Sequence, residues 1–581
     1  MRLNKVLNFK KTNHYPAIPG VGVKRSLVWG RRQIGLLCLV LALSACADNL
    51  LKDLNPFKEE EDESLRGSVG FVQGFIGGVV TDEPRATLIG RDILSSGGTA
   101  ADAAVAVSFA LSVTLPSSAS LGGGGVCLVH DAETNTTETL DFLTGIPQRI
   151  PSTAVVPTAV PGLVRGLAAL HSKYGRLKWT QLISPAETLA RFGNQVSRAF
   201  AADLKQLPST KTVDPEFFRI LGKKNERRFI KEGDFLKQLD LSSVLGRLRA
   251  RGAGDFYLGL LARQLVGAVT DAGGSLALDD LRAYTPHWRP TLKIPYIKNT
   301  KFHFPISAGL PGALAGQMVG MLIEHDDWED ASPAERAHLM AEVSGRAYAA
   351  RSRWLRKKGL SAVRPSRLVS QAYIKDLFAG YQPERHLRFD GGGTMPATAP
   401  GNSTGTGFVI VDLHGSAVAC SLTLNNLFGA GRIAPGMGIL LAGLPGPLGR
   451  GPDSVSAVLL LNDIQNLFHF GAAASGGNPA TSAMAGVTAG TLFGSDEEGL
   501  ERALQAKRLH NNGVPDITYY EQGLNGAITE DLSKWGHQLS PAPPMALVNA
   551  IFCSTGVPQK EEISCAIRQD PRGFGLGVGA E

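Results

Sequence analysis

Hydroxyl and glycine residues gather in the segment Gly401–Gly407, directly before an apolar run, and could place an attacking oxygen on a tight turn. Gly401, Ser403 and Gly405 match the G-x-S-x-G pattern of a serine nucleophile elbow. Such an elbow joins a strand to a helix, whereas here a loop-like stretch precedes the pattern and the strand-like run Phe408–Asp412 follows it. We therefore do not assign Ser403 as a nucleophile.

Metal, phosphate and nucleic-acid chemistry find no support in the sequence. It contains no HExxH, no pair of CxxC motifs and no phosphate-binding Gly-Lys-Ser/Thr, and its twelve His show no metal-ligand spacing. The formal net charge of +7 comes from residues 1–45, which hold eight Lys or Arg and no acidic residue. The rest of the chain has 51 basic and 52 acidic residues, so we expect no nucleic-acid partner, no metal and no cofactor.

Helix-like and strand-like patterns alternate from about residue 70, in a chain with 43% hydrophobic residues. The patterns predict helices at Arg91–Leu115, Pro333–Leu355 and Thr481–Phe493, among others. They predict strands at Phe408–Asp412, Ala417–Leu424 and Ala457–Leu461, and a hairpin at Phe552–Ile567. The fold class is therefore α+β, with a helix-rich first part and a sheet-rich last third.

Ten short segments follow one another in an order that resembles the γ-glutamyltransferase (glutathione hydrolase) family. They are Ser96–Ala106, Pro116 with Leu121–Gly125, Val160–Gly162, Tyr174-Gly175 with Pro185-Ala186, Phe256–Gly259, Asp280–Tyr284, Ala347–Arg351, Thr423–Gly429, Ser475–Gly477, and Arg508–His510 with Asp570–Gly573. The resemblance implies an N-terminal-nucleophile hydrolase with an αββα sandwich. In that family the precursor cuts itself before a Thr, and the two resulting segments stay associated. The freed Thr attacks an amide carbonyl with its own α-amino group as the base.

The same resemblance points to site residues and leaves the nucleophile open. The family motif Thr-Thr-His aligns without gaps on Gly405, Thr406 and Gly407, so the first Thr is missing, and Thr404 and Thr406 are the candidates. A shift by one residue turns a side chain to the other face of the strand. The residues that match the nucleophile-orienting and oxyanion-binding positions are Thr423, Asn425, Gly476 and Gly477.

Substrate recognition departs from the family. Leu143 stands where the family has an Arg for the glutamyl carboxylate, and the segment Ala442–Pro447 lacks the Asp that holds the ammonium group. Of a Ser-Ser pair that binds substrate, Ser456 alone is retained. Two hypotheses therefore stand side by side. One is an autoprocessing Thr amide hydrolase or transferase with an altered peptide or amide substrate. The other is a catalytically degenerate member that binds a ligand or partner.

The N-terminal residues have the features of a bacterial lipoprotein signal. Arg31 and Arg32 precede the apolar run Ile34–Ser44, which is shorter than the about 20 residues of a membrane-spanning helix. Leu43-Ser44-Ala45-Cys46 resembles a lipobox, in which the Cys is lipidated; an ordinary signal followed by a chance Cys is the alternative. We expect a signal peptide at 1–45, an acidic tether at 46–69 and a periplasm-facing protein held by lipid in the outer membrane.

The remaining expectations concern the body of the chain and its cysteines. By the resemblance, residues 70–403 form a large-subunit-like segment and 404–581 a small-subunit-like segment of one intertwined domain. Cys127 and Cys420 lie in apolar strand-like stretches and are expected to be buried free thiols. Cys553 and Cys565 lie on two apolar runs joined by a polar turn, which predicts a disulfide across the last hairpin or two unpaired thiols.

Overall fold

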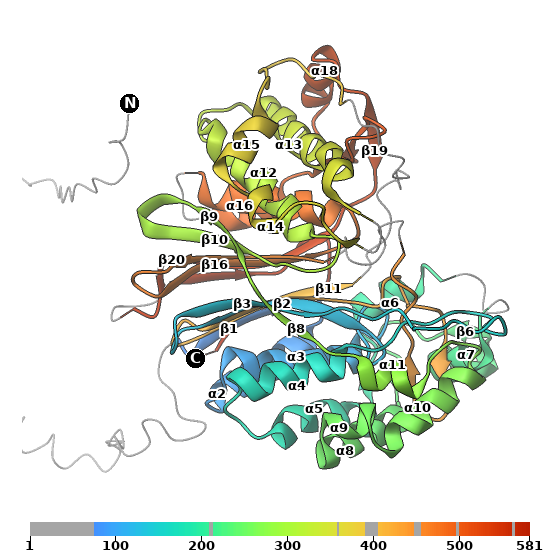
Figure 1. Cartoon of the computed structure of the whole chain (residues 1–581). Helices are drawn as coiled ribbons and strands as arrows, with labels where there is room; N and C mark the ends of the chain where they lie inside the picture. Colours follow the sequence, from blue (N-terminus) through green and yellow to red (C-terminus); the bar gives the residue numbers. More distant parts are fainter. Residues whose placement is uncertain are drawn as a thin grey trace, which may run out of the picture. The chain divides into compact units, whose positions relative to one another are not determined.

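Two antiparallel sheets lie face to face in the computed structural model, and helices cover the outer side of each (Figure 1). The model describes residues 75–207, 213–356, 359–389, 405–446, 455–494, 499–559 and 564–580. These residues all belong to the unit Gly67–Glu581. The layer order is the predicted αββα sandwich of an α+β fold.

The first sheet has seven strands in the order β22-β1-β11-β12-β2-β3-β8. Their bounds are Leu576–Ala580, Gly77–Thr81, Thr406–Asp412, Ala417–Thr423, Gly124–Asp131, Thr136–Phe142 and His287–Pro290. The second sheet has six strands in the order β21-β20-β16-β15-β10-β9. Their bounds are Cys565–Arg568, Leu547–Val557, Leu467–Ser475, Ser456–Asn462, Thr300–Phe304 and Leu292–Pro295.

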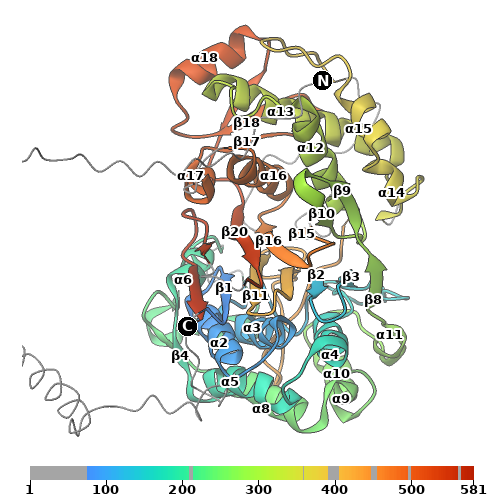
Figure 2. The ribbon, with the colours of Figure 1, turned by 90° about the vertical axis from the view of Figure 1, so that its left-hand side faces the viewer.

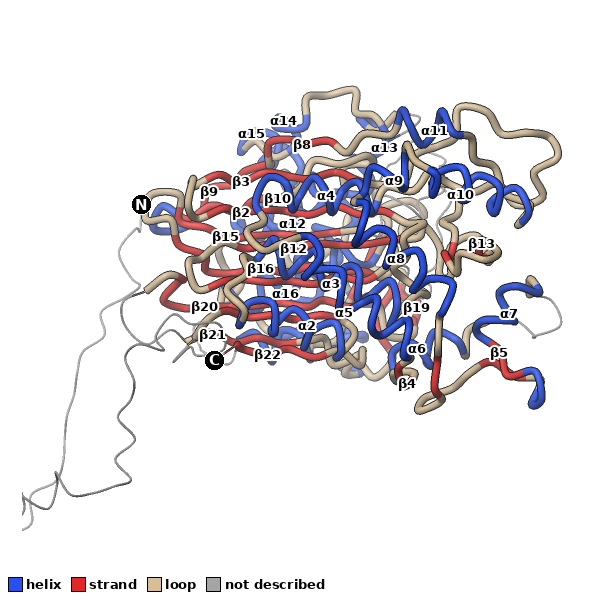
Figure 3. The backbone as a smooth tube through the Cα atoms, turned by 90° about the horizontal axis from the view of Figure 1, so that it is seen from below, coloured by secondary structure: helices blue, strands red, loops and turns tan. Residues whose placement is uncertain are grey.

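Helices of the first half of the chain cover the first sheet, and later helices cover the second (Figure 2). The first group comprises α2 (Pro84–Ser95), α3 (Ala100–Thr114), α4 (Leu163–Tyr174), α5 (Trp179–Phe192), α6 (Arg198–Leu204), α7 (Pro215–Leu221), α8 (Leu239–Arg251), α9 (Ala253–Tyr257), α10 (Leu260–Asp271) and α11 (Leu278–Ala283). The second group comprises α12 (Pro311–His325), α13 (Pro333–Trp354), α14 (Pro365–Leu368), α15 (Gln371–Phe378), α16 (Pro479–Leu492), α17 (Gly499–Gln505) and α18 (Gly526–Lys534). Figure 3 views the molecule from the side of the first group, where α3 and α4 lie over the strands.

Small two- and three-stranded sheets complete the second layer and the loops. The three-stranded sheet joins β17 (Leu509–Asn511), β18 (Thr518–Glu521) and β19 (Leu539–Ala542). The pairs are β13 (Ile433–Ala434) with β14 (Ile439–Leu440), β4 (Asn194–Gln195) with β7 (Phe235–Leu236), and β5 (Gly222–Lys223) with β6 (Arg228–Phe229). None of the helices within the described ranges is long and apolar enough to cross a bilayer.

The alternation of strand β11 divides its side chains between two cores. Phe408 and Ile410 pack against the helices on the outer side of the first sheet, whereas Val409 and Val411 pack between the two sheets. Both faces are buried, because a sheet inside a sandwich is covered on each side. The sequence of β11 is therefore a continuous apolar run and does not alternate between apolar and polar residues.

The predicted helix Arg91–Leu115 is two helices in the structure. α2 ends at Ser95 and α3 begins at Ala100, with Gly97 (φ 79°) in the turn between them. Thr99 caps α3 by accepting the Asp102 backbone N–H, and the Asp102 side chain in turn accepts the Thr99 N–H. All of α3 is buried, so its Ala-rich sequence reflects close packing against the sheet rather than an amphipathic surface.

Cys127 and Cys420 form a disulfide and are not the free thiols expected from the sequence. They lie opposite each other on β2 and β12, with their Cα atoms 4.1 Å apart, because the strand order brings these distant segments into register. A second disulfide joins Cys553 and Cys565 across the β20–β21 pair. Both cysteines of the first bond are completely buried.

Candidate active site

The start of β11 holds Thr406, the one nucleophile candidate within the described residues. Thr406 is fully buried, and its Oγ1 donates a hydrogen bond to Asp82 Oδ2 at 2.8 Å. Asp82 follows β1, whose register with β11 pairs Thr81 with Phe408 and so brings Asp82 beside Gly407. The Gly407 N–H also donates to Asp82 Oδ2 at 3.2 Å. Thr404, the other candidate, lies outside the described residues, as does Cys46.

Asn549 fixes the second oxygen of this carboxyl group. Its Nδ2 donates to Asp82 Oδ1 and to the Gly407 carbonyl oxygen, both at 2.7 Å. Asn549 lies on β20 of the second sheet, so it joins the two sheets at the start of β11. Thr406, Asp82 and Asn549 thus form a hydroxyl–carboxyl–amide chain, which is the arrangement of a nucleophile, a base and a group that orients the base.

Burial changes the protonation of Asp82. It raises the pKa of the carboxyl group to about 6, against the hydrogen bonds from Thr406, Asn549 and the Gly407 N–H, which lower it. A carboxyl group with a pKa near the working pH can both take and return a proton. No local pattern in the sequence points to Asp82 or Asn549, because each lies far along the chain from Thr406.

Gly405 occupies a backbone conformation that suits glycine. Its φ is +102°, and a Cβ on this residue would lie 2.5 Å from the Leu422 carbonyl oxygen. The family's first Thr aligns here, and a Thr could not enter this conformation without displacing the neighbouring strand. The hydroxyl group at the start of β11 is therefore that of Thr406, whose side chain lies on the opposite face of the strand from position 405.

Asn425 holds together the two segments in which the family's substrate charges are missing. Its Nδ2 donates to Thr144 Oγ1 at 2.8 Å and to the Gly443 carbonyl oxygen at 2.7 Å. Its own N–H donates to Thr423 Oγ1 at 2.9 Å. Asn425 is 2% exposed and has a φ of 69°, which an Asn tolerates better than most residues. Segments 141–144 and 442–443 therefore meet around an uncharged amide.

Gly476 and Gly477 form the turn between β16 and α16, with φ values of 122° and 77°. A Cβ on Gly476 would lie 2.5 Å from the Ala546 Cα, whereas a Cβ on Gly477 would meet Pro479 Cδ at 4.0 Å, an ordinary contact. The first backbone N–H groups of a helix have no partner inside it, so those at the start of α16 can donate hydrogen bonds to a negatively charged oxygen. β16 of the second sheet packs closely against the start of β11, since a Cβ on Gly407 would lie 2.9 Å from the Ala473 carbonyl oxygen.

Ser456 faces away from this group. Its Oγ contacts Met484 Sδ of α16 at 3.5 Å, on the helix-covered side of the second sheet. Thr406 begins β11, Thr423 ends the neighbouring strand β12, and Gly476 and Gly477 follow the end of β16. The Ser456 hydroxyl contacts Met484 rather than these residues. A cavity of about 590 Å³ between α13, α16 and α17 also lies apart from the site, because none of these residues lines it.

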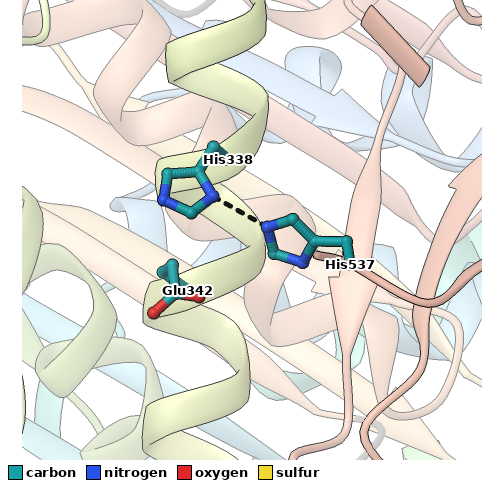
Figure 4. A group of neighbouring side chains, drawn as sticks. All are labelled: His338, Glu342 and His537. Carbon is teal, nitrogen blue, oxygen red and sulfur yellow. Dashed lines mark hydrogen bonds between the residues drawn. The ribbon is translucent and has the colours of Figure 1, made fainter. Parts of the chain in front are cut away.

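A buried group of His338, Glu342 and His537 has the composition of a metal site (Figure 4). It is the one such group found within the described ranges, and its candidate ligand atoms lie within 4.8 Å of one another. His338 and Glu342 are neighbours at i and i+4 on α13, and the fold brings His537 to them from a segment about 200 residues further along the chain.

Hydrogen bonds account for every ring nitrogen of this group. His338 Nε2 donates to the Gln382 carbonyl oxygen at 3.0 Å, so its Nδ1 accepts from His537 Nε2 at 2.7 Å. His537 Nδ1 then accepts from Thr518 Oγ1 at 3.2 Å. Burial lowers the pKa of both rings, that of His537 to about 3, which keeps them neutral. The arrangement is that of a satisfied polar network under the helices of the second layer.

A third imidazole beside this network carries a charge. His386 lies between Glu342 Oε1 at 2.5 Å and Asp516 Oδ2 at 2.8 Å. Burial lowers the pKa of His386, but the bonds to Asp516 and Glu342 outweigh it and raise the pKa to about 9. A protonated ring between two carboxylates ties α13 to the loop that precedes β18.

Known proteins with similar sequences and folds agree with this architecture. The family model for gamma-glutamyltranspeptidase matches residues 86–443. A glutathione hydrolase proenzyme of Escherichia coli is 28% identical over 539 residues, which cover 84% of this chain and 90% of the relative. A glutathione hydrolase proenzyme of Pseudomonas aeruginosa is 28% identical over 545 residues, covering 86% and 94%.

Among solved structures, a cephalosporin acylase from Bacillus halodurans superposes with a TM-score of 0.73 at 21% identity, covering 90% of this chain and 99% of its own. At that identity the likeness establishes the fold alone. The family model covers more than half of the chain, and the two sheets with their covering helices form the sandwich that the resemblance predicted. The chain belongs to the γ-glutamyltranspeptidase family.

Proposed function

We propose that this protein is an amide hydrolase or transferase of the γ-glutamyltransferase type, with Thr406 as its nucleophile after self-cleavage at the Gly405–Thr406 bond. The observation that carries the proposal is the 2.8 Å hydrogen bond from the Thr406 hydroxyl to the buried Asp82 carboxyl at the start of β11. The name proenzyme, borne by the relatives from Escherichia coli and Pseudomonas aeruginosa, supports a cut. The two resulting segments would remain associated through the shared first sheet, in which β11 pairs with β1.

The substrate differs from the zwitterionic γ-glutamyl group of the named relatives. Asn425 contacts Gly443 and Thr144, the residue after Leu143, and none of these residues brings a charge. A zwitterion would therefore forgo two charge-assisted interactions, each worth about 1.5–3 kcal/mol. We propose that the acyl group of the substrate is uncharged at the end that enters this junction.

Self-cleavage is tested by denaturing electrophoresis of the purified protein under reducing conditions. We expect a fragment that begins at Thr406, identified by N-terminal sequencing. Thr406→Ala should abolish the cut, and Thr406→Ser should retain it. Thr404→Ala is the matched control, since it should leave the cut in place. An intact chain after prolonged incubation, with both Ala variants like the wild type, would favour the non-catalytic alternative.

Substrate choice is tested by comparing a γ-glutamyl anilide with anilides of uncharged acyl groups. We expect the γ-glutamyl compound to be turned over far more slowly. Robust turnover of it with a low Michaelis constant would show that other residues supply the two charges. Both compounds release the same chromophore, so the comparison isolates the acyl group.

We further propose that the protein is a periplasm-facing lipoprotein anchored through Cys46. The lipobox-like Leu43–Cys46 and the basic flank before it support this proposal, and Ala47 after the Cys favours outer-membrane sorting. Cys46→Ser should leave the protein unlipidated, as measured by labelling with a fatty-acid analogue. Unchanged labelling of that variant would refute the anchor without bearing on the chemistry at Thr406.

A further inference from the structure

We propose that Asp82 is the general base that activates Thr406 for cleavage of the Gly405–Thr406 peptide bond. The inference rests on the proposed function, because it names the group that begins the self-cleavage. The 2.8 Å between Thr406 Oγ1 and Asp82 Oδ2 is within the reach of a nucleophile and its base. Asn549 holds the other oxygen of the base at 2.7 Å and so fixes its direction.

The uncut chain needs a base other than the one used after cleavage. A hydroxyl group is a weak nucleophile without a neighbouring proton acceptor. Before the cut the nitrogen of Thr406 is an amide, whose lone pair is delocalised, so it cannot serve as that acceptor. Asp82 is the hydrogen-bond acceptor that the Thr406 hydroxyl has in the described structure, and it is fixed in place before any cut.

The burial of Thr406 suits a reaction inside the chain. Its side chain has no exposed surface, so no external amide reaches it in this state. Self-cleavage requires only the carbonyl group of the preceding residue, which is covalently attached. Gly405 carries that carbonyl in a φ of +102°, against the Leu422 backbone. In this state the Thr406 hydroxyl is therefore inaccessible to an external substrate but adjacent to the Gly405–Thr406 peptide bond.

The step balances with one water molecule. Thr406 Oγ attacks the Gly405 carbonyl carbon while its proton passes to Asp82. The C–N bond then breaks, and Asp82 returns the proton to the departing nitrogen, which becomes the α-amino group of Thr406. The resulting ester between Gly405 and Thr406 Oγ is hydrolysed by water. This leaves a Gly405 carboxylate and a free Thr406 hydroxyl.

The charges around Asp82 come from three directions. Asp570, beyond Asn549, raises the pKa of Asp82, and Asp570 is itself paired with Arg508. Asp203 of α6 is close enough for Asp82 to raise its pKa. Glu83, the next residue, is directed to α2, where it accepts the Ala86 N–H. No Lys or Arg hydrogen-bonds to Asp82 in the described structure, so burial governs when it loses its proton.

The test is a time course of cleavage in the full-length precursor made by cell-free synthesis and then shifted to a chosen pH. We expect the wild-type rate to rise about tenfold per pH unit below pH 6 and to level off above it, since the base must be deprotonated. Asp82→Asn should slow cleavage at pH 7.5 by about 10²–10⁴-fold and remove the plateau. Asp82→Glu, which keeps the carboxyl group, should restore part of the rate.

Asp412→Asn is the matched control. Asp412 is a buried carboxyl at the opposite end of β11, where it accepts the backbone N–H groups of Ala100, His414 and Ser416. Its variant should cleave at the wild-type rate. Near-ultraviolet circular dichroism and thermal unfolding of each precursor separate loss of folding from loss of the base.

The outcomes separate this inference from the proposed function. If Asp82→Asn is folded and cleaves at the wild-type rate, Asp82 is not the base, while Thr406 as nucleophile stands. A wild-type rate that does not change between pH 4.5 and 7.5 would overturn the role of Asp82 even if Asp82→Asn fails to fold. If the wild type itself never cleaves, the proposed function fails first, and this inference with it.

Discussion

The disulfide between Cys127 and Cys420 makes a sharp prediction about a cleaved chain. Cys127 lies in the large-subunit-like segment and Cys420 in the small-subunit-like segment, on opposite sides of the proposed cut. After cleavage the two segments should therefore remain one covalent molecule. Electrophoresis without reductant should show a single species, and the fragment that begins at Thr406 should appear only with reductant.

The size of the stabilisation follows from the separation of 293 residues between these cysteines. In the chain-entropy model, closing so long a loop is worth about 6 kcal/mol, whereas the 12-residue separation of Cys553 and Cys565 gives about 3 kcal/mol. Native disulfides usually contribute about 2–5 kcal/mol when removed, so we expect a loss near 5 kcal/mol in the uncut chain.

The assay compares two double variants by chemical denaturation and by electrophoresis. Cys127→Ala with Cys420→Ala should lower the free energy of unfolding and release the fragment without reductant. In the cut protein its unfolding midpoint should also depend on concentration, because two separate chains must then reassemble. Cys553→Ala with Cys565→Ala is the control: it should cost less and leave the fragments linked, since both residues lie on one side of the cut.

Two results would refute this reasoning. One is recovery of Cys127 and Cys420 as free thiols from oxidised, folded protein by peptide mapping. The other is release of the fragment from the cut wild type without reductant. Either would mean that β2 and β12 hold the segments together by pairing and packing alone.

Three further predictions concern the rest of the fold. His386 binds its proton more tightly in the folded state, where its pKa is about 9, than in the unfolded state, where it is 6.5. Its contribution to the free energy of unfolding should therefore be complete below pH 6.5 and lost as the pH rises through 9. His386→Asn should flatten that decline in a denaturation series from pH 6 to 10, and an unchanged slope would contradict the ion pairs. Asn425→Ala removes two side-chain hydrogen bonds from a buried junction and should lower the free energy of unfolding by about 2–4 kcal/mol, measured by urea titration. A loss below about 0.5 kcal/mol, which is typical of a surface substitution, would disprove the junction. Gly476→Ala should destabilise the protein by about 3 kcal/mol or more, because its Cβ would clash with Ala546. Gly477→Ala should destabilise it by about 1 kcal/mol. Equal thermal shifts for the two variants would show that the turn differs from this geometry.

Local patterns were enough to predict much of the architecture. The apolar run that became β11, the Gly turn before α16 and the Cys553–Cys565 hairpin each depend on residues close together in the chain. Strand and turn preferences act over a few residues, so such features are visible in the sequence. The order of the family segments then predicted the αββα sandwich, which the fold confirms.

Two sequence-based expectations failed, the first for a local reason and the second because residues that pair in space are distant in the chain. The helix Arg91–Leu115 is broken because Gly97 and Gly98 interrupt it before the Ala-rich run that forms α3. The free thiols at Cys127 and Cys420 are a disulfide because β2 and β12 pair in register across 293 residues. No spacing rule connects two cysteines on separate strands until the strand order is known.

The sequence alone indicated the family, the nucleophile candidates Thr404 and Thr406, and the absence near Leu143 of the charged residues that the family motifs carry, since these depend on which residues occupy an ordered set of motifs. The tertiary structure alone decided which groups Thr406 contacts. Asp82, directly after β1, accepts its hydroxyl, and Asn549 of β20 holds Asp82 from the second sheet. Burial of this group raises the pKa of the carboxyl group. Contact and desolvation are properties of the packed sandwich, because both require that residues hundreds of positions apart exclude water together.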